Sequence, residues 1–267
     1  MDMKTLFSVN ELRVAYRKSG GKSHEAVKGV SFDLHRGETL GIVGESGSGK
    51  STIAKALMLL QGISGGKVLF KGEDISQFSS SRKKQYRREV QMVFQDATGS
   101  LNPRMTIRSM LREVLSLQDS VNKVDTDKRI KELLDLTGLA EAILDRYPRE
   151  LSGGQCQRAS FARALAARPE VLVADEPVSA LDVSVQARIL NLMRDLRHEL
   201  NLSIILIAHD LAVVRNVCDR VAVMNKGEFV DFGDAEDVFS NPQSNYTKDL
   251  LDAVPDVDRA LSLNKGM

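Results

Sequence analysis

The sequence predicts an α/β fold. Short apolar runs that are typical of buried strands occur at 39–43, 171–174 and 203–208. Segments in which apolar residues recur at helical spacing lie between these runs. Glycine and proline mark several boundaries, as at Gly153-Gly154 and Arg168-Pro169. Strands that alternate with helices in this way are typical of α/β proteins.

The first part of the chain is expected to be rich in strands. Apolar and polar residues alternate from 30 to 34, and the apolar run at 39–43 ends at a glycine. A helix is predicted from Lys50 to about Leu60. The elements expected next are strands at 67–70 and 90–94 and helices at 106–117 and 127–136. The middle of the chain is therefore predicted to be mostly helical.

The second half of the chain repeats the alternation. A helix is predicted after Gly153-Gly154 as far as Ala167, where Arg168-Pro169 ends it. The elements expected after it are a strand at 171–174, a helix at 185–200, a strand at 203–208 and a hairpin at 221–231 that turns at 225–227.

Composition limits the classes of protein that the chain can represent. Its 267 residues suggest one large domain or a core with an inserted subdomain. The 37 Lys and Arg against 36 Asp and Glu give a net charge of +1, so no overall field attracts nucleic acid or anionic lipid. Cys156 and Cys218 form no CxxC pair and are too few for a disulfide framework or a structural zinc site.

Two further observations concern membranes. No run approaches the ~18 consecutive apolar residues that cross a bilayer. The residues at 1–5 lead into a polar stretch without the apolar core of a signal peptide. We therefore expect the chain to stay in the cytoplasm.

A glycine-rich motif follows the run at 39–43 and matches GxxxxGK[ST], which binds nucleotide phosphates between a strand and a helix. Backbone N–H groups of such a loop point at phosphate oxygens. Lys50 is expected to place a charge at the β- and γ-phosphates, and Ser51 to offer a hydroxyl to Mg²⁺. An ordinary Gly/Ser turn is the alternative. The motif consists of Gly44, Glu45, Ser46, Gly47, Ser48, Gly49, Lys50, Ser51 and Thr52.

Two acids end the run at 171–174. In a protein with this phosphate loop, Asp175 is expected to serve the metal. Glu176 then lies next to the γ-phosphate, where its carboxylate can orient water or accept its proton as a general base. Taken alone, an apolar strand followed by two acids is equally compatible with a plain strand end.

A second Ser/Gly turn, Leu151-Ser152-Gly153-Gly154-Gln155, opens another helix and offers further amides to phosphate. This stretch resembles the signature sequence of ATP-binding cassette (ABC) proteins, and the resemblance extends over essentially the whole chain. The other motifs follow in the order of that family. They are Tyr16 at the position that stacks on adenine, Gln95 of the Q-loop, Ser179-Ala180-Leu181-Asp182 of the D-loop and His209 of the switch.

The resemblance implies a P-loop ATPase core with an antiparallel β subdomain and an inserted helical subdomain. The chain is then a single domain, 1–267, with its core at 1–95 and 152–240. The helical subdomain spans about 96–151, and a tail spans about 241–267. Two cassettes pack head to tail in this family, so Ser152, Gly153, Gly154 and Gln155 of one contact the ATP held by the P-loop of the other. A single copy is expected to be nearly inactive.

Roles at the site follow from the same resemblance. ATP and Mg²⁺ are the expected cofactors. Glu176, His209 and Lys50 are the expected catalytic residues, with His209 holding Glu176 and the water in place. Ser51, Gln95 and Asp175 are the expected metal contacts.

Three stretches resemble the ATPases of dipeptide, oligopeptide and nickel importers: 94–104, 178–187 and 245–255. In the last, Ser244-Asn245 replaces the usual His-Pro. The implied partners are a second ATPase subunit, identical or different, two transmembrane permease subunits and, indirectly, an extracytoplasmic solute-binding protein. The implied location is the cytoplasmic face of the inner or plasma membrane. The solute stays open.

Other functions were weighed against this one. The stretch 82–88 holds five basic residues, which fit either a nucleic-acid patch or, as we favour, a solvated helix before 90–94. A soluble ABC ATPase acting on nucleic acid or the ribosome is the rival, although no nucleic acid is expected. The signature loop argues against a GTPase or a kinase. Cys156, where relatives carry a polar residue, is expected to be a buried helix-face cysteine.

Overall fold

The computed structural model describes residues 5–17, 23–117, 123–179 and 181–253, and it contains two sheets. One has four strands in the order β2-β1-β4-β5, and the other has six in the order β10-β9-β3-β8-β7-β6. The strands are β1 (Thr5–Arg17), β2 (Ser23–His35), β3 (Thr39–Val43), β4 (Gly65–Phe70), β5 (Glu73–Asp74), β6 (Val90–Val93), β7 (Val171–Asp175), β8 (Ser203–Ala208), β9 (Arg220–Asn225) and β10 (Glu228–Asp234).

Ten α-helices lie among the described residues, together with three short 3-10 helices at 75–77, 141–143 and 148–150. The α-helices are α1 (Lys50–Leu57), α2 (Ser80–Glu89), α3 (Ala97–Ser100), α4 (Ile107–Ser116), α5 (Lys123–Thr137), α6 (Gly153–Ala166), α7 (Val183–Leu200), α8 (Leu211–Arg215), α9 (Ala235–Ser240) and α10 (Asn245–Asp252). Among these described helices, none combines the length and apolar character that crossing a bilayer requires.

The larger sheet is parallel from β6 through β9, and only β10 pairs antiparallel. Strands β3, β7 and β8 are buried on both faces, which explains why they read as continuous apolar runs. Their alternate residues enter two different cores, since Ile42 faces one cluster and Val43 the other. The carboxyl ends of these parallel strands meet at one edge of the sheet, where the site lies.

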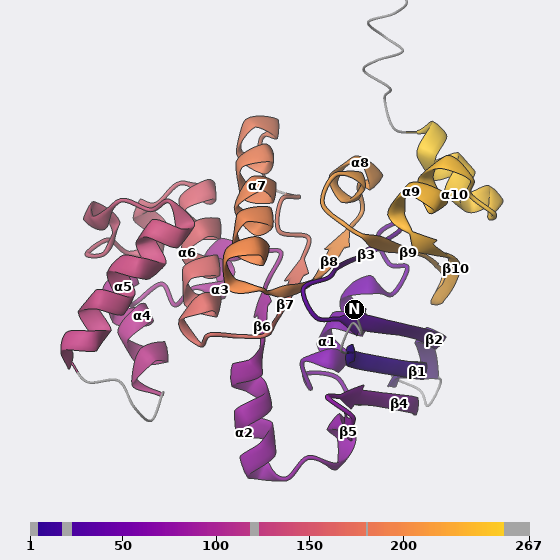
Figure 1. The fold of residues 1–267 in the computed structure, drawn as a ribbon, viewed down its shortest axis with the longest axis horizontal. Coiled ribbons are helices and arrows are strands. Elements are labelled where there is room, and N and C mark those ends of the chain that lie inside the picture. The colour runs from indigo at the N-terminus through magenta and orange to yellow at the C-terminus, as the bar shows by residue number, and fades with distance from the viewer. Residues whose placement is uncertain (1–4, 18–22, 118–122, 180, 254–267) are drawn as a thin grey trace, which may run out of the picture.

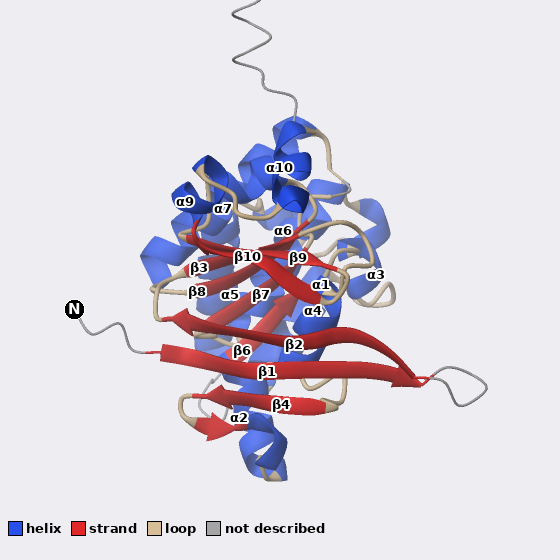
Figure 2. Cartoon of the chain, turned by 90° about the vertical axis from the view of Figure 1, so that its right-hand side faces the viewer, coloured by secondary structure: helices blue, strands red, loops and turns tan. Residues whose placement is uncertain are grey.

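The two cores lie on opposite faces of this sheet. On one face, the antiparallel sheet and α1 cover it, as Figure 2 shows from the side of β1 and β2. On the other, α4, α5 and α6 gather beside α7 (Figure 1). In the described part of 97–150, all regular structure is helical, as the proposed helical subdomain requires. The division of the chain into subdomains stays a proposal.

Most predicted elements are found close to their predicted bounds. Two strands, at 39–43 and 203–208, match to the residue. Helix α1 ends at Leu57 rather than near Leu60, because Leu59 takes a φ of 56° that no α-helix continues. The stretch 82–88 lies in α2, as the favoured interpretation requires. Sequence periodicity missed several described elements, among them the helices α3, α8, α9 and α10.

Candidate functional site

The loop between β3 and α1 needs its glycines. Gly44, Gly47 and Gly49 have φ values of 150°, 81° and 117°, a region that side chains disfavour. A Cβ at Gly44 would lie 2.1 Å from the carbonyl oxygen of Met224, and one at Gly49 would lie 2.4 Å from that of Ala26. A Cβ at Gly47 would meet nothing within 4 Å. The chain therefore wraps tightly at both ends of the loop and leaves open space at its middle.

Lys50 is almost fully buried at the start of α1, with 3% of its surface exposed. Its ammonium donates to the carbonyl oxygens of Gly44, at 2.6 Å, and Glu45, at 2.8 Å. Burial lowers the pKa of Lys50, while the nearby carboxylates of Glu176 and Asp175 act in the opposite direction. The side chain thus folds back onto the loop and holds a positive charge there.

Asp175 ends β7 with 6% of its surface exposed. Its Oδ1 accepts a hydrogen bond from the hydroxyl of Ser51 at 3.0 Å. Burial raises the pKa of Asp175, the Ser51 hydroxyl lowers it, and the charge of Glu176 raises it further. A buried carboxylate oxygen beside a hydroxyl oxygen is a donor pair suited to a hard cation such as Mg²⁺.

Glu176 follows in the left-handed region, with φ of 45°, and its N–H donates to the carbonyl of Ile207 at 2.9 Å. This turn carries the side chain off the end of β7. Its Oε2 accepts from Nε2 of Gln95 at 3.0 Å and lies 3.1 Å from Nδ1 of His209. The carboxylate is 13% exposed and the imidazole 52%. Three residues predicted from separate motifs therefore meet around one carboxylate.

These groups line a cavity of about 600 Å³. Most of its lining comes from the predicted site residues, and Ala26 also lines it. The lining residues are Ala26, Ser46, Gly47, Gly49, Lys50, Ser51, Thr52, Gln95, Glu176, Ser179 and His209. Tyr16 hydrogen-bonds through its hydroxyl to Oγ1 of Thr52 at 3.3 Å. The tyrosine thus lies beside the cavity, and its contact with adenine stays a prediction.

The signature loop lies outside this cavity. Ser152 caps α6 by accepting from the Gln155 N–H at 3.3 Å, and Oε1 of Gln155 accepts in return from the Ser152 N–H at 2.9 Å. Gly153 lines a separate cavity of about 450 Å³, together with Gln95 and Ser179. Ser152 and Gly153 are exposed, so the N-terminus of α6 is open to a partner.

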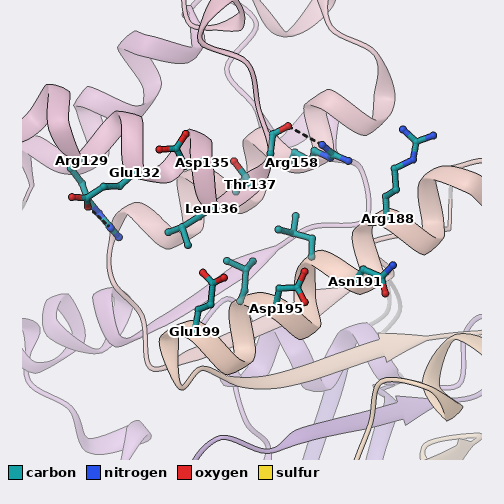
Figure 3. A pocket seen from close by; sticks show the side chains of 13 residues that line it. Arg129, Glu132, Asp135, Leu136, Thr137, Arg158, Arg188, Asn191, Asp195 and Glu199 are labelled. Atoms are coloured by element: carbon teal, nitrogen blue, oxygen red, sulfur yellow. Dashed lines mark hydrogen bonds and ion pairs between the residues drawn. The ribbon is translucent and has the colours of Figure 1, made fainter.

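A larger cavity, of about 730 Å³, lies between α5 and α7 (Figure 3). Arg129 there pairs with Glu132 at 3.1 Å, and Arg158 donates to the carbonyl of Gly138 at 2.9 Å. Its lining includes none of the predicted site residues. The candidate site is therefore the smaller cavity at the glycine loop.

Two other sequence predictions can be compared with the structure. Cys156 is buried in α6 and its thiol lies 3.4 Å from the carbonyl of Pro148, which confirms the helix-face interpretation. Arg82 of the basic stretch pairs with Glu89 at 2.7 Å and with Glu73 at 3.3 Å. Sequence reasoning missed the contact of the loop residue Glu45 with Tyr246 of α10, because nothing in a motif marks a contact between segments so far apart.

Comparison with known proteins agrees with this geometry. The family model described as ABC transporter matches residues 27–179. The chain belongs to the ABC transporter family. This confirms the membership and the fold class that the motifs predicted.

Relatives and solved structures of the family extend the comparison. The chain is 44% identical to the oligopeptide transport ATP-binding protein OppF of Streptococcus mutans, over 97% of this chain and 84% of that protein. It is 48% identical to the oligopeptide transport ATP-binding protein AppF of Bacillus subtilis, over 86% of this chain and 70% of that protein. A dimeric structure of the ATP-binding cassette MJ0796, bound to ADP and Pi after hydrolysis, aligns with a TM-score of 0.78 at 28% identity, over 86% of this chain and 99% of that one.

Proposed function

We propose that this chain is the ATP-hydrolysing subunit of an ABC importer for a small solute, and that it works as one of two head-to-tail cassettes on a membrane permease. The observation that carries this proposal is the carboxylate of Glu176, held between Gln95 and His209 over the cavity of the glycine loop. The relatives named as oligopeptide transport ATP-binding proteins favour short peptides as the solute. Nickel and related solutes stay open.

In the proposed mechanism, loop amides and Lys50 bind the phosphates of ATP. The ammonium of Lys50 already lies inside the loop, where it donates to two backbone carbonyl oxygens. When ATP binds, it donates to phosphate oxygens in their place. Glu176 orients the attacking water and takes its proton. His209 holds that carboxylate from the other side and contributes orientation more than proton transfer.

The residues present also fit Mg²⁺. The Ser51 hydroxyl and the Asp175 carboxylate are 3.0 Å apart, and Gln95 lines the same cavity as Ser51. When bound, the ion would neutralise charge on the phosphates. Asp175 and Ser51 would hold it.

A second cassette completes the site in this proposal. The signature loop of the same chain does not line the cavity at the glycine loop, so its amides at the start of α6 are available to ATP bound on a partner. The dimeric MJ0796 structure supports the pairing of two cassettes. The partner is either a second copy or a sister ATPase.

The remaining partners are two multispanning permease subunits and, through them, an extracytoplasmic solute-binding protein. The chain then sits peripherally on the cytoplasmic face of the membrane. Specificity for the solute lies with the permease and the binding protein, which this chain powers.

Affinity isolation of the chain from detergent-solubilised native membranes, followed by mass spectrometry, tests the proposal. We expect two multispanning proteins and a cassette partner to co-purify. Recovery of ribosomal proteins or nucleic acid without a permease would instead assign the chain to the soluble ABC ATPases.

A further inference from the structure

The tail helix α10 is fixed to the sheet at its first turn. The carboxylate of Asp231 in β10 is 8% exposed and accepts from the N–H groups of Gln243, at 3.1 Å, and Ser244, at 3.0 Å. It also accepts a hydrogen bond from the hydroxyl of Thr247, which is fully buried. A register shift in the pairing of β9 with β10 falls just before Asp231 and re-aims its side chain. Three bonds to one buried carboxylate determine where α10 begins.

Tyr246 lies within this fixed turn and reaches the glycine loop. The N–H of Glu45 donates to the phenol oxygen of Tyr246 at 3.1 Å. The tyrosine is half-buried, and it packs with Leu250 and Leu251 against the core on the face of α7 and α8. The helix therefore places one hydroxyl on the backbone of the nucleotide loop.

The peptide group that binds Tyr246 also binds the side chain of Lys50. The Gly44–Glu45 peptide donates its N–H to Tyr246 and accepts at its carbonyl from the Lys50 ammonium, at 2.6 Å. Tyr246 thus fixes one side of the peptide plane, and Lys50 fixes the other. Glu45 does not line the cavity, so Tyr246 acts from the outer side of the loop. When Lys50 turns toward phosphate, the bond to Tyr246 is the one left to hold this peptide plane.

We infer that Tyr246 is a positioning residue of the nucleotide site, and that docking of α10 and occupation of the loop by nucleotide stabilise each other. The inference rests on the proposed function, because it concerns the same loop. Linkage makes the effect reciprocal: the factor by which the docked helix tightens nucleotide binding equals the factor by which nucleotide tightens helix docking. In this proposal, helix α10 contributes directly to nucleotide binding.

The test uses the full chain with Tyr246→Phe, which keeps the ring and its packing and removes the hydroxyl. One neutral hydrogen bond corresponds to about a two- to tenfold change in an equilibrium constant. We therefore expect ATP to bind about two- to tenfold more weakly by calorimetry, and the urea midpoint to fall slightly, because the lost bond also holds α10 in the folded chain. Lys248→Ala, on the exposed side of α10, is the matched control and should leave both quantities unchanged.

A second measurement follows amide hydrogen exchange in α10. In the wild type, ATP should slow this exchange by the same factor that Tyr246→Phe costs in affinity, and in Tyr246→Phe ATP should no longer slow it. Thr247→Val, which removes one bond to Asp231 but keeps the phenol, should weaken ATP binding in the same direction while also lowering the urea midpoint.

The outcomes separate the two proposals. A wild-type chain that binds no ATP would overturn the proposed function. A wild-type chain that binds ATP, with the same affinity in Tyr246→Phe and no effect of ATP on exchange in α10, would leave the proposed function standing and refute the linkage. A lower urea midpoint in Tyr246→Phe with unchanged ATP affinity would assign the phenol to packing alone, which also refutes it.

Discussion

Glu176 combines an unusual backbone with a crowded carboxylate. Its φ of 45° costs about 1–2 kcal/mol for a residue with a Cβ, and the N–H bond to Ile207 holds the turn. Glu176→Gln keeps the shape of the side chain and removes the carboxylate that we propose as the general base. We expect turnover to fall by about 10²–10⁴-fold, with ATP still bound and paired cassettes accumulating, measured by phosphate release and size-exclusion chromatography.

Glu199→Gln is the control for this variant, because it makes the same change on the exposed end of α7. It should hydrolyse ATP like the wild type. Wild-type turnover in Glu176→Gln would remove that residue from the role of general base.

Substitution of Asp175 should raise the stability of the fold while lowering the ATPase activity. Because burial raises its pKa, the folded protein holds a proton more tightly than the unfolded chain, so its contribution to stability is lost as pH rises through the raised pKa. At pH 7, Asp175→Asn should raise the urea midpoint and lower Mg²⁺-dependent turnover by ~100-fold or more. The gain in midpoint should shrink as pH falls through the raised pKa of Asp175. A lower midpoint at pH 7 would contradict the burial argument.

At the scale of elements, an ion network joins the start of β7 to the turn before β3 and to the end of β4. The carboxylate of Glu170 pairs with Arg36 at 2.7 Å and also with Lys71. Lys71 in turn lies 3.0 Å from Glu89. Burial alone raises the pKa of Glu170, but Lys71 and Arg36 outweigh it, so its pKa lies below the usual value.

Glu170→Gln should therefore lower the free energy of unfolding by about 1–3 kcal/mol at pH 7. A lowered pKa contributes stability above the unfolded value, and this contribution is lost as pH falls through the folded value. The difference in free energy of unfolding between the variant and the wild type, measured by urea unfolding, should thus become smaller below pH ~4. A difference independent of pH would show that charge is not the cause.

Individual elements differ in how well the sequence predicts them. Strands β3 and β8 are buried on both faces, so their apolar runs mark them clearly. The end of α1 depends on the backbone at Leu59, which no periodicity reveals. The site residues of the motifs could be predicted because each motif is a short stretch of sequence that directly follows a strand or begins a helix. The bond from Glu45 to Tyr246 could not, because tertiary packing alone brings α10 to the loop.

At the scale of the whole molecule, the proposed composite site needs two chains. No residue of the signature loop lines the cavity at the glycine loop, although Gln95 and Ser179 line both that cavity and the one at Gly153. Turnover per chain should therefore rise with chain concentration, in parallel with the dimer fraction in sedimentation, because only paired cassettes complete a site.

A constant turnover per chain under conditions where only monomer sediments would contradict the composite site. Activity that is absent at every concentration but is restored by a sister cassette would identify a heterodimer as the working form.

Strand β3 has a consequence for biosynthesis. Thr39 pairs with Ile204 of β8 on one side, and Leu40 pairs with Arg220 of β9 on the other. During translation, the strand that leads into the glycine loop thus emerges roughly 160 residues before either neighbour, a delay of about 10–30 s at ~5–20 residues per second. Over that time its apolar residues and both of its edges lack their final partners, which exposes the nascent chain to misfolding.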